Sequence, residues 1–213
     1  MNGISVPRVD QVMDLGITIN PDLKFSVYID SCVSKAYSRS FLIYKSFSSR
    51  NPFLLTKAFS TYVRPLLEYN SYLWSPIDIG SINKLENIQR RFTKRINCIS
   101  NLSYNERLNI LGLQTLEYRR LFCDLVTMYK IVHNLFDIDR DSFIILAESN
   151  STRNSTLKIF KPRVTASLRA KFICVRCINA WNYLPCSVRS ASSVFNFKKK
   201  LKFCDLSTFF NCF

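Results

Sequence analysis

Two cysteines have the spacing of half a structural zinc site. Cys174 and Cys177 are separated by two residues, as in the Cys-x-x-Cys half of many such sites. Tetrahedral zinc needs a second pair at a matching spacing, and the other candidates are scattered along the chain: Cys186, Cys204, Cys212 and His133. The apolar neighbours Ile178 and Trp181 favour core packing of both thiols instead. The sequence therefore predicts no zinc site.

The segment at 137–148 matches part of a calcium-binding loop. Acidic residues stand at loop positions 1, 3, 5 and 12, namely Asp137, Asp139, Asp141 and Glu148. Position 6 normally needs glycine for its sharp turn, but Ser142 stands there. A polar run at 149–155 also replaces the exit helix. We therefore predict an acidic surface loop rather than a calcium site.

No arrangement of residues indicates catalysis. His133 is the only histidine, and no serine or cysteine can be tied to it by a known spacing. No glycine-rich phosphate loop occurs, and no two of the 15 acidic residues are adjacent. Paired carboxylates for two metal ions are therefore missing. We predict that the chain is not an enzyme and that it takes no cofactor and no small-molecule substrate.

Positive charge is the outlying property of the chain. It has 30 lysines and arginines against 15 acidic residues, a net charge of +15. Such a balance favours a polyanionic partner. The basic residues gather in five clusters: Arg90, Arg91, Lys94 and Arg95; Arg119 and Arg120; Lys158, Lys161 and Arg163; Arg169, Lys171 and Arg176; and Lys198, Lys199, Lys200 and Lys202.

Few of these cations have an acidic neighbour on the same helix face. At a spacing of four residues, Glu86 can pair with Arg90, and Asp124 with Arg120. Aromatic residues such as Tyr62 or Tyr72 could stack on bases. We therefore predict nucleic-acid contacts at eight residues: Arg90, Arg91, Lys94, Arg95, Arg119, Arg120, Lys198 and Lys199.

The elements that would position these residues are mainly helical. Residues 9–19 favour a strand, and helical periodicity begins at Ser26. A second helix should begin at Asn51-Pro52 and kink or break near Thr61, because Pro65 lacks the backbone donor that the helix needs. After Ser81 a third helix places one face inward, comprising Ile82, Leu85, Ile88, Gln89, Phe92 and Ile96.

The second half continues the helical pattern. Ser103 and Glu106 form a capping-box pattern for a short helix that ends at Gly112. A long helix is expected over 115–134, a short strand within 157–164 and one helix over 170–183. A last helix should begin at Ser192 or Ser193. The fold class is therefore mainly α.

The expected cellular location rests on two features that the sequence does not show, a membrane-spanning segment and a signal peptide. No run of about 18 apolar residues is present, so no spanning helix is expected. The first residues lack the apolar core of a signal peptide. We expect an intracellular protein, cytoplasmic or nuclear, whose cysteines are reduced.

Six segments, taken in order, resemble one family. They are DLGITINPDLKFSVYI, YVRPLLEYNSYLWSP, INKLENIQRRFTKRI, LSYNERLNILGLQTLEYRRLFCDLVTMYKI, INAWNYLP and SVFNFKKKL. Together they resemble the C-terminal part of reverse transcriptases from non-LTR, LINE-type (jockey-like) retrotransposons, over residues 3–203. The family usually has histidine where this chain has Tyr28, which departs from the pattern.

The resemblance implies a thumb and the region that follows it. Residues 1–24 would be the remnant hairpin of the palm–thumb junction, and 25–100 a thumb-like helical bundle lying along the template–primer duplex. Residues 101–213 would form a C-terminal helical region with an irregular segment at 137–169. The kinked segment at 62–76 would pack its aromatic side inward.

The palm motif with its paired aspartates is missing from the sequence, so the resemblance implies a fragment without polymerase activity. The expected residual role is sequence-tolerant binding of RNA or of an RNA–DNA duplex, with the missing palm and fingers as a second partner. Two alternatives remain open: a basic helical protein-interaction module without nucleic-acid function, and a basic peripheral membrane binder.

Overall fold

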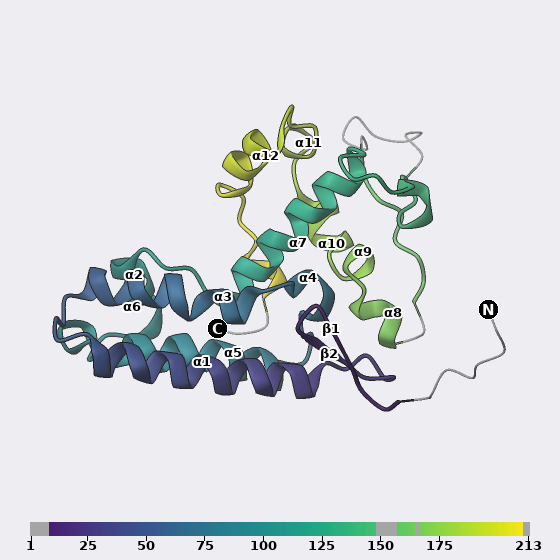
Figure 1. Ribbon diagram of the computed structural model, residues 1–213. Helices are drawn as coiled ribbons and strands as arrows, with labels where there is room; N and C mark the ends of the chain where they lie inside the picture. Colours follow the sequence, from purple (N-terminus) through teal and green to yellow (C-terminus); the bar gives the residue numbers. More distant parts are fainter. Residues whose placement is uncertain (1–8, 148–156, 165–166, 211–213) are drawn as a thin grey trace.

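The computed structural model describes residues 9–147, 157–164 and 167–210 (Figure 1). It confirms a mainly helical fold that begins with a two-stranded antiparallel hairpin. Strand β1 (Val12–Asp14) pairs with β2 (Ile17–Ile19). The two residues between them, Leu15 and Gly16, both have positive φ, at 46° and 80°, which is the backbone of a tight two-residue hairpin turn.

Six helices follow the hairpin and build the first half of the molecule. They are α1 (Ser26–Ser46), α2 (Pro52–Tyr62), α3 (Arg64–Glu68), α4 (Ser71–Trp74), α5 (Ile79–Lys94) and α6 (Tyr104–Leu111). Short polar side chains begin several of them. The side-chain oxygen Oδ1 of Asn51 accepts from the amides of Phe53 and Leu54, and the Asp78 carboxylate accepts from the Ser81 amide. The predicted capping box of Ser103 and Glu106 is present.

The second helix breaks at Val63, two residues beyond the predicted position. Pro65 has no amide to donate, and its ring clashes with the carbonyl four residues earlier, so α2 cannot run on. The chain resumes as α3 and α4, and Trp74 then enters the core. Its indole nitrogen donates to the Tyr69 carbonyl at 2.7 Å, and its ring meets the edge of Tyr28.

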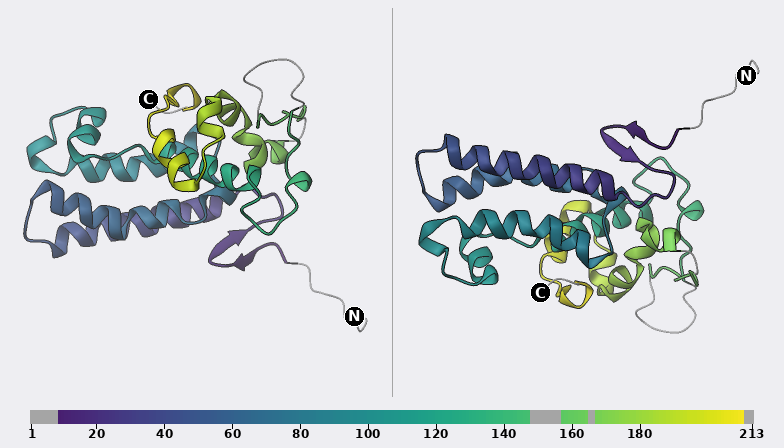
Figure 2. Two further views of the ribbon diagram at one scale, coloured as in Figure 1. Left: turned by 90° about the horizontal axis from the view of Figure 1, so that it is seen from above. Right: turned by 90° about the horizontal axis from the view of Figure 1, so that it is seen from below.

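One apolar core holds this half together. The predicted inward face of α5 is confirmed, because all six of its residues are buried. Phe92 lies at the centre, between the rings of Phe59 on α2 and Tyr44 on α1, with centroids 4.6 and 4.9 Å away. The long helices α1 and α5 run side by side along the bundle (Figures 1 and 2).

The predicted long helix is confirmed as α7 (Leu116–Val132), which joins two cores. Leu116 packs in the first core, whereas Leu125 begins a second. The two cores therefore meet within α7. Short helices gather around α7 in the second half (Figures 1 and 2): α8 (Ser167–Lys171), α9 (Ile173–Arg176), α10 (Ile178–Tyr183), α11 (Cys186–Arg189) and α12 (Val194–Leu201).

Two expectations for this half are wrong. The single helix over 170–183 is three helices, because the backbone at Phe172 is extended and Cys177 leaves the helical region. Neither residue is glycine or proline, so no local signal marks the breaks. The strand within 157–164 is reduced to an isolated bridge between Leu146 and Ile159. Three short 3-10 turns complete the described chain: Asn97–Ile99, Arg140–Ser142 and Ser207–Phe209.

Candidate nucleic-acid interface

The strongest charge asymmetry lies along α1 and α5. Residues 31–67 and 87–105 contain ten lysines and arginines and no acidic residue. The cations are Lys35, Arg39, Lys45, Arg50, Lys57, Arg64, Arg90, Arg91, Lys94 and Arg95. Because α1 packs against α5, the cations of these two helices add to a single field, whereas Lys57 lies on α2 and Arg64 on α3 pairs with Glu68. A polyanion approaching this end of the bundle would meet no acidic side chain from either segment.

The predicted basic cluster of α5 is assembled at the C-terminal end of that helix. Arg91, Lys94 and Arg95 are exposed and Arg90 is half-buried, opposite the buried apolar face. Three of these side chains rest on tyrosine rings. Arg91 lies over Tyr37, Arg95 over Tyr44 and Arg90 over Tyr104, with guanidinium carbons 5.1 to 5.3 Å from the ring centroids.

These tyrosines hold the arginines in place without neutralising them. A guanidinium on an aromatic face keeps its charge and its outward N–H donors. Tyr44 is itself fixed, because its hydroxyl donates to the Phe92 carbonyl at 2.6 Å. Arg107 ties α6 to the same end of α5, donating to Thr93 Oγ1 and to two backbone carbonyls. The cations are therefore positioned by packed neighbours rather than left as free surface charges.

The buried hydroxyl of Tyr44 should make the protein sensitive to alkali. Burial raises the pKa of Tyr44 to about 12, against the opposing effect of Arg95 and Arg50. An unfolded tyrosine loses its proton near pH 10. Between about pH 10 and 12 the unfolded state then binds fewer protons than the folded one, so the free energy of unfolding falls as pH rises.

Tyr44→Phe should make that fall shallower, as measured by chemical denaturation at successive pH values. An unchanged slope for Tyr44→Phe would show that Tyr44 titrates alike in both states.

The structure removes Arg119 and Arg120 from the predicted contacts. Arg119 donates two N–H groups to the carboxylate of Glu68 on α3, and the distance from Nη2 to Oε2 is 2.8 Å. Arg120 is only 2% exposed, and its two terminal nitrogens find no hydrogen-bond partner among the described residues. Burial lowers the pKa of Arg120, and nearby carboxylates led by Glu86 oppose this. Arg119 is therefore ion-paired within the fold, and Arg120 lies in its interior.

The two pairs predicted along one helix also find other partners. Glu86 is buried and accepts from the Leu116 amide at 2.9 Å and from the Tyr104 hydroxyl. It therefore anchors the start of α7 instead of pairing with Arg90, and burial raises its pKa. Asp124 pairs with Arg176 of α9 through two N–H···O bonds of 2.8 and 2.9 Å. Arg176 is thereby removed from the predicted basic cluster.

The remaining predicted contacts lie on a separate element. Lys198 and Lys199 are exposed on α12, which packs against α7 in the second half of the molecule. They are not brought together with the cations of α5. Among the aromatic candidates, Tyr62 and Tyr72 are about half exposed, on α2 and α4.

The other motifs have structural roles in the described chain. Cys174 and Cys177 are buried, and the Cys177 thiol donates to the Ile173 carbonyl. His133 ends α7 with a ring nitrogen 2.8 Å from the Arg189 carbonyl oxygen. Asp139 caps a 3-10 turn, and Glu148 lies outside the described residues. Within 9–147, 157–164 and 167–210, no three metal-ligating residues cluster, and no helix is long and apolar enough to cross a bilayer.

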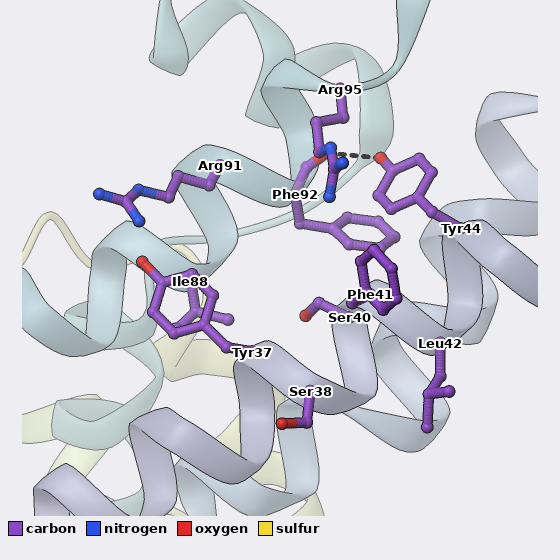
Figure 3. Close-up of a pocket in the computed structure, with 10 residues that line it drawn as sticks. All are labelled: Tyr37, Ser38, Ser40, Phe41, Leu42, Tyr44, Ile88, Arg91, Phe92 and Arg95. Carbon is purple, nitrogen blue, oxygen red and sulfur yellow. Dashed lines mark hydrogen bonds between the residues drawn. The ribbon is translucent and has the colours of Figure 1, made fainter.

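A hollow of about 700 Å³ opens between α1 and α5 beside the basic cluster. Arg91 and Arg95 stand on its α5 side, while Tyr37 and Phe41 project from α1 (Figure 3). A second hollow adjoins it and shares Phe41, Tyr44 and Arg95 with the first. It adds a further set of polar and basic residues, Lys45, Arg50 and Asn97.

Sequence reasoning missed most of this hollow. The signal available was the pair Phe41 and Leu42, two apolar residues that fall off the buried stripe of α1. They are 56% and 51% exposed. The partners of the arginines, Tyr37 and Tyr44, lie on α1, and only the packed structure shows each ring beneath a guanidinium.

Comparisons with known proteins add one relative. The chain is 27% identical over 126 residues to the uncharacterized protein B0403.1 of Caenorhabditis elegans. The alignment covers 58% of this chain and 64% of that protein, so the match spans less than two thirds of the relative's length. No protein-family model matches the chain, and no solved structure matches it.

Proposed function

We propose that this chain binds nucleic acid through the C-terminal end of α5 and the adjoining part of α1. The observation that carries the proposal is the field of ten cations without one acidic residue over 31–67 and 87–105. Nucleic-acid affinity is dominated by phosphate contacts, which need fixed cations and little base readout. The tyrosine-supported arginines of α5 meet that need.

The proposed partner is RNA or an RNA–DNA duplex, bound with little sequence preference. This agrees with the resemblance to the thumb region of non-LTR retrotransposon reverse transcriptases, in which the palm and fingers would be the second partner. We propose no catalysis by this chain, since its sequence has no adjacent acidic residues to hold two metal ions. Its site of action would be the cytoplasm or nucleus, where RNA is met.

A second candidate function is a protein-interaction module, which the apolar side chains exposed in the α1–α5 hollow favour. Salt dependence separates the two candidates. A protein that neutralises several phosphates releases counterions, so its binding constant falls steeply with salt, with a logarithmic slope of about −0.9 per contact on duplex DNA.

We expect a blunt RNA–DNA hybrid to bind with a slope of about −3 to −4 between 50 and 300 mM salt, from the four cations of α5. Fluorescence anisotropy with hybrids of unrelated sequence measures both the slope and the sequence tolerance. Absence of binding at 50 mM salt, or a slope near zero, would refute the nucleic-acid function.

A further inference from the structure

The hollow between α1 and α5 contains a buried hydroxyl without a partner. Ser40 is 8% exposed, and its Oγ makes no hydrogen bond within the described residues. Figure 3 shows this oxygen directed into the space between the rings of Tyr37 and Phe41. An unpaired buried hydroxyl is costly, because its hydrogen bond to water has been lost and not replaced. Neighbouring side chains cover the oxygen, so a ligand in the hollow would make the missing bond as those side chains move aside.

The walls of the hollow combine aromatic faces with fixed cations. Phe41 is 56% exposed beside the buried Phe92, and so offers a free ring face. Arg91 and Arg95 stand one helical turn apart on the opposite side, each over a tyrosine. Residues at that spacing have Cβ atoms about 5–6 Å apart, so the two cations flank the hollow rather than fill it.

We infer that this hollow receives an unpaired nucleotide of the bound strand. The base would stack on Phe41 with its edge toward Ser40 Oγ, and the flanking phosphates would lie on Arg91 and Arg95. The inference rests on the proposed function and sharpens it: the preferred substrate is a strand with unpaired nucleotides, such as the single-stranded end of a duplex. Lys45 and Arg50 in the adjoining hollow continue the path for the backbone.

Three features favour a nucleotide over a peptide. The lining of the hollow includes the Ser40 hydroxyl, and an apolar side chain of a bound peptide would leave this hydroxyl without a hydrogen bond. Each cation borders an aromatic ring, as in sites where successive bases stack and the backbone follows a basic groove. A hydroxyl can donate or accept, so one serine can meet the edge of any base. Bases paired inside a duplex would not reach the hollow, whereas unpaired bases can be splayed outward.

The test compares a blunt RNA–DNA hybrid with the same hybrid carrying a single-stranded RNA overhang. One overhang nucleotide is 2-aminopurine, whose fluorescence falls when it stacks on an aromatic ring. We expect the parent protein to bind the overhang hybrid more tightly and to quench the analogue. Phe41→Ala should lower the affinity for the overhang hybrid by about 5- to 100-fold, the range for loss of one base stack. It should also abolish the quenching and leave the blunt hybrid bound as before.

Two further variants define the site. Phe53→Ala on α2 is the matched control, because Phe53 is also a largely exposed phenylalanine on a helix, and it should change neither affinity. Ser40→Ala should lower the affinity for the overhang hybrid several-fold. Because it removes an unpaired buried hydroxyl, its thermal unfolding temperature should be no lower than that of the parent, which would show that folding is intact.

The outcomes separate this inference from the function on which it rests. The nucleotide site is refuted if the parent binds both hybrids equally. It is also refuted if the Phe41→Ala variant quenches the 2-aminopurine fluorescence as strongly as the parent does. In either case duplex binding stands. If neither hybrid binds, both proposals fail. If an acidic amphipathic peptide displaces the overhang hybrid and loses affinity with Phe41→Ala while the quenching persists, the hollow is a protein-docking groove and the inference is overturned.

Discussion

Asp124→Ala should lower the free energy of unfolding by about 3–5 kcal/mol, the usual cost of leaving one partner of a buried ion pair alone. Asp124 and Arg176 are 4% and 9% exposed in their side chains, and two parallel hydrogen bonds join them. Arg176 also donates to the carbonyls of Tyr72 and Lys171 at 2.8 and 2.7 Å. The pair therefore holds α7, α9 and the end of α4 together.

A second buried cation increases the expected loss. Arg120 lies one turn before Asp124 with its terminal nitrogens unpartnered in the described chain, and Asp124 is among the carboxylates that oppose its desolvation. Removal of Asp124 leaves both guanidinium groups with less compensating charge. Because a domain is stable by only about 5–15 kcal/mol, the variant should unfold at a much lower urea concentration than the parent.

The chain offers a matched exposed pair as control. Asp30 and Lys84 are joined at 2.7 Å, but their side chains are more than half exposed, and such pairs contribute about 0–1 kcal/mol. Asp30→Ala should therefore cost far less than Asp124→Ala in urea unfolding followed by circular dichroism. Equal losses for the two variants would mean that the Asp124–Arg176 pair is not buried in solution.

A double variant tests the pairing directly. If Asp124 and Arg176 interact as described, Asp124→Ala combined with Arg176→Met should cost less than the sum of the two single changes. Additive losses would show that the two side chains act independently.

Local rules predicted the helices well where one periodic face is buried. The stripe of α5 from Ile82 to Ile96 and the caps at Asn51 and Ser103 are read from spacing and chemistry that do not depend on the rest of the fold. The break caused by Pro65 is of the same kind, since proline acts on its own helix.

Side-chain partners were predicted poorly, because tertiary contacts outweigh pairing along a helix. The acids Glu86 and Asp124 have basic residues four positions away, yet their hydrogen bonds go to groups 18 to 52 residues distant. A surface pair of that kind contributes only a few tenths of a kcal/mol, whereas a buried acceptor left unsatisfied costs several times more. The fold therefore satisfies the buried group first.

The adjacent arginines Arg119 and Arg120 show the same limit for the candidate site. In sequence they are two equivalent cations on a helix. In the structure they point to different surroundings, one to Glu68 and the other into the core, because neighbouring residues on a helix are about 100° apart. The hollow with Ser40 and Phe41 was not predicted, since it requires two helices to be packed before it exists.

The largest effect on binding is expected from the four cations of α5. Changing Arg90, Arg91, Lys94 and Arg95 together to Gln removes four charges while keeping helix propensity. The variant should bind an RNA–DNA hybrid more weakly across all sequences, with a logarithmic salt slope shallower by about 2 to 4. The loss of three arginine–tyrosine contacts should cost some stability as well, so a melting curve is measured beside each binding curve.

A matched set of lysines distinguishes a docked helix from a general charge effect. Lys198, Lys199, Lys200 and Lys202 on and just after α12 are exposed, and changing them to Gln removes the same charge from the other half of the molecule. If long-range electrostatic attraction alone governs binding, the glutamine substitutions in the α5 set and in the α12 set should weaken binding equally. If the phosphates lie on α5, the first set should weaken binding more and should alone reduce the slope by the full amount.

Replacing the three arginines of that set with lysine separates charge from geometry. Lysine keeps the charge but lacks the planar fork that lies flat on tyrosine and holds two phosphate oxygens at once. We therefore expect the all-lysine variant to retain the salt slope of the parent and still bind several-fold more weakly. Parent affinity in that variant would show that the tyrosine-held orientation of Arg90, Arg91 and Arg95 plays no part. Equal losses from the α5 and α12 glutamine sets would refute docking on α5 and leave the protein-interaction module as the better explanation of the exposed hollow.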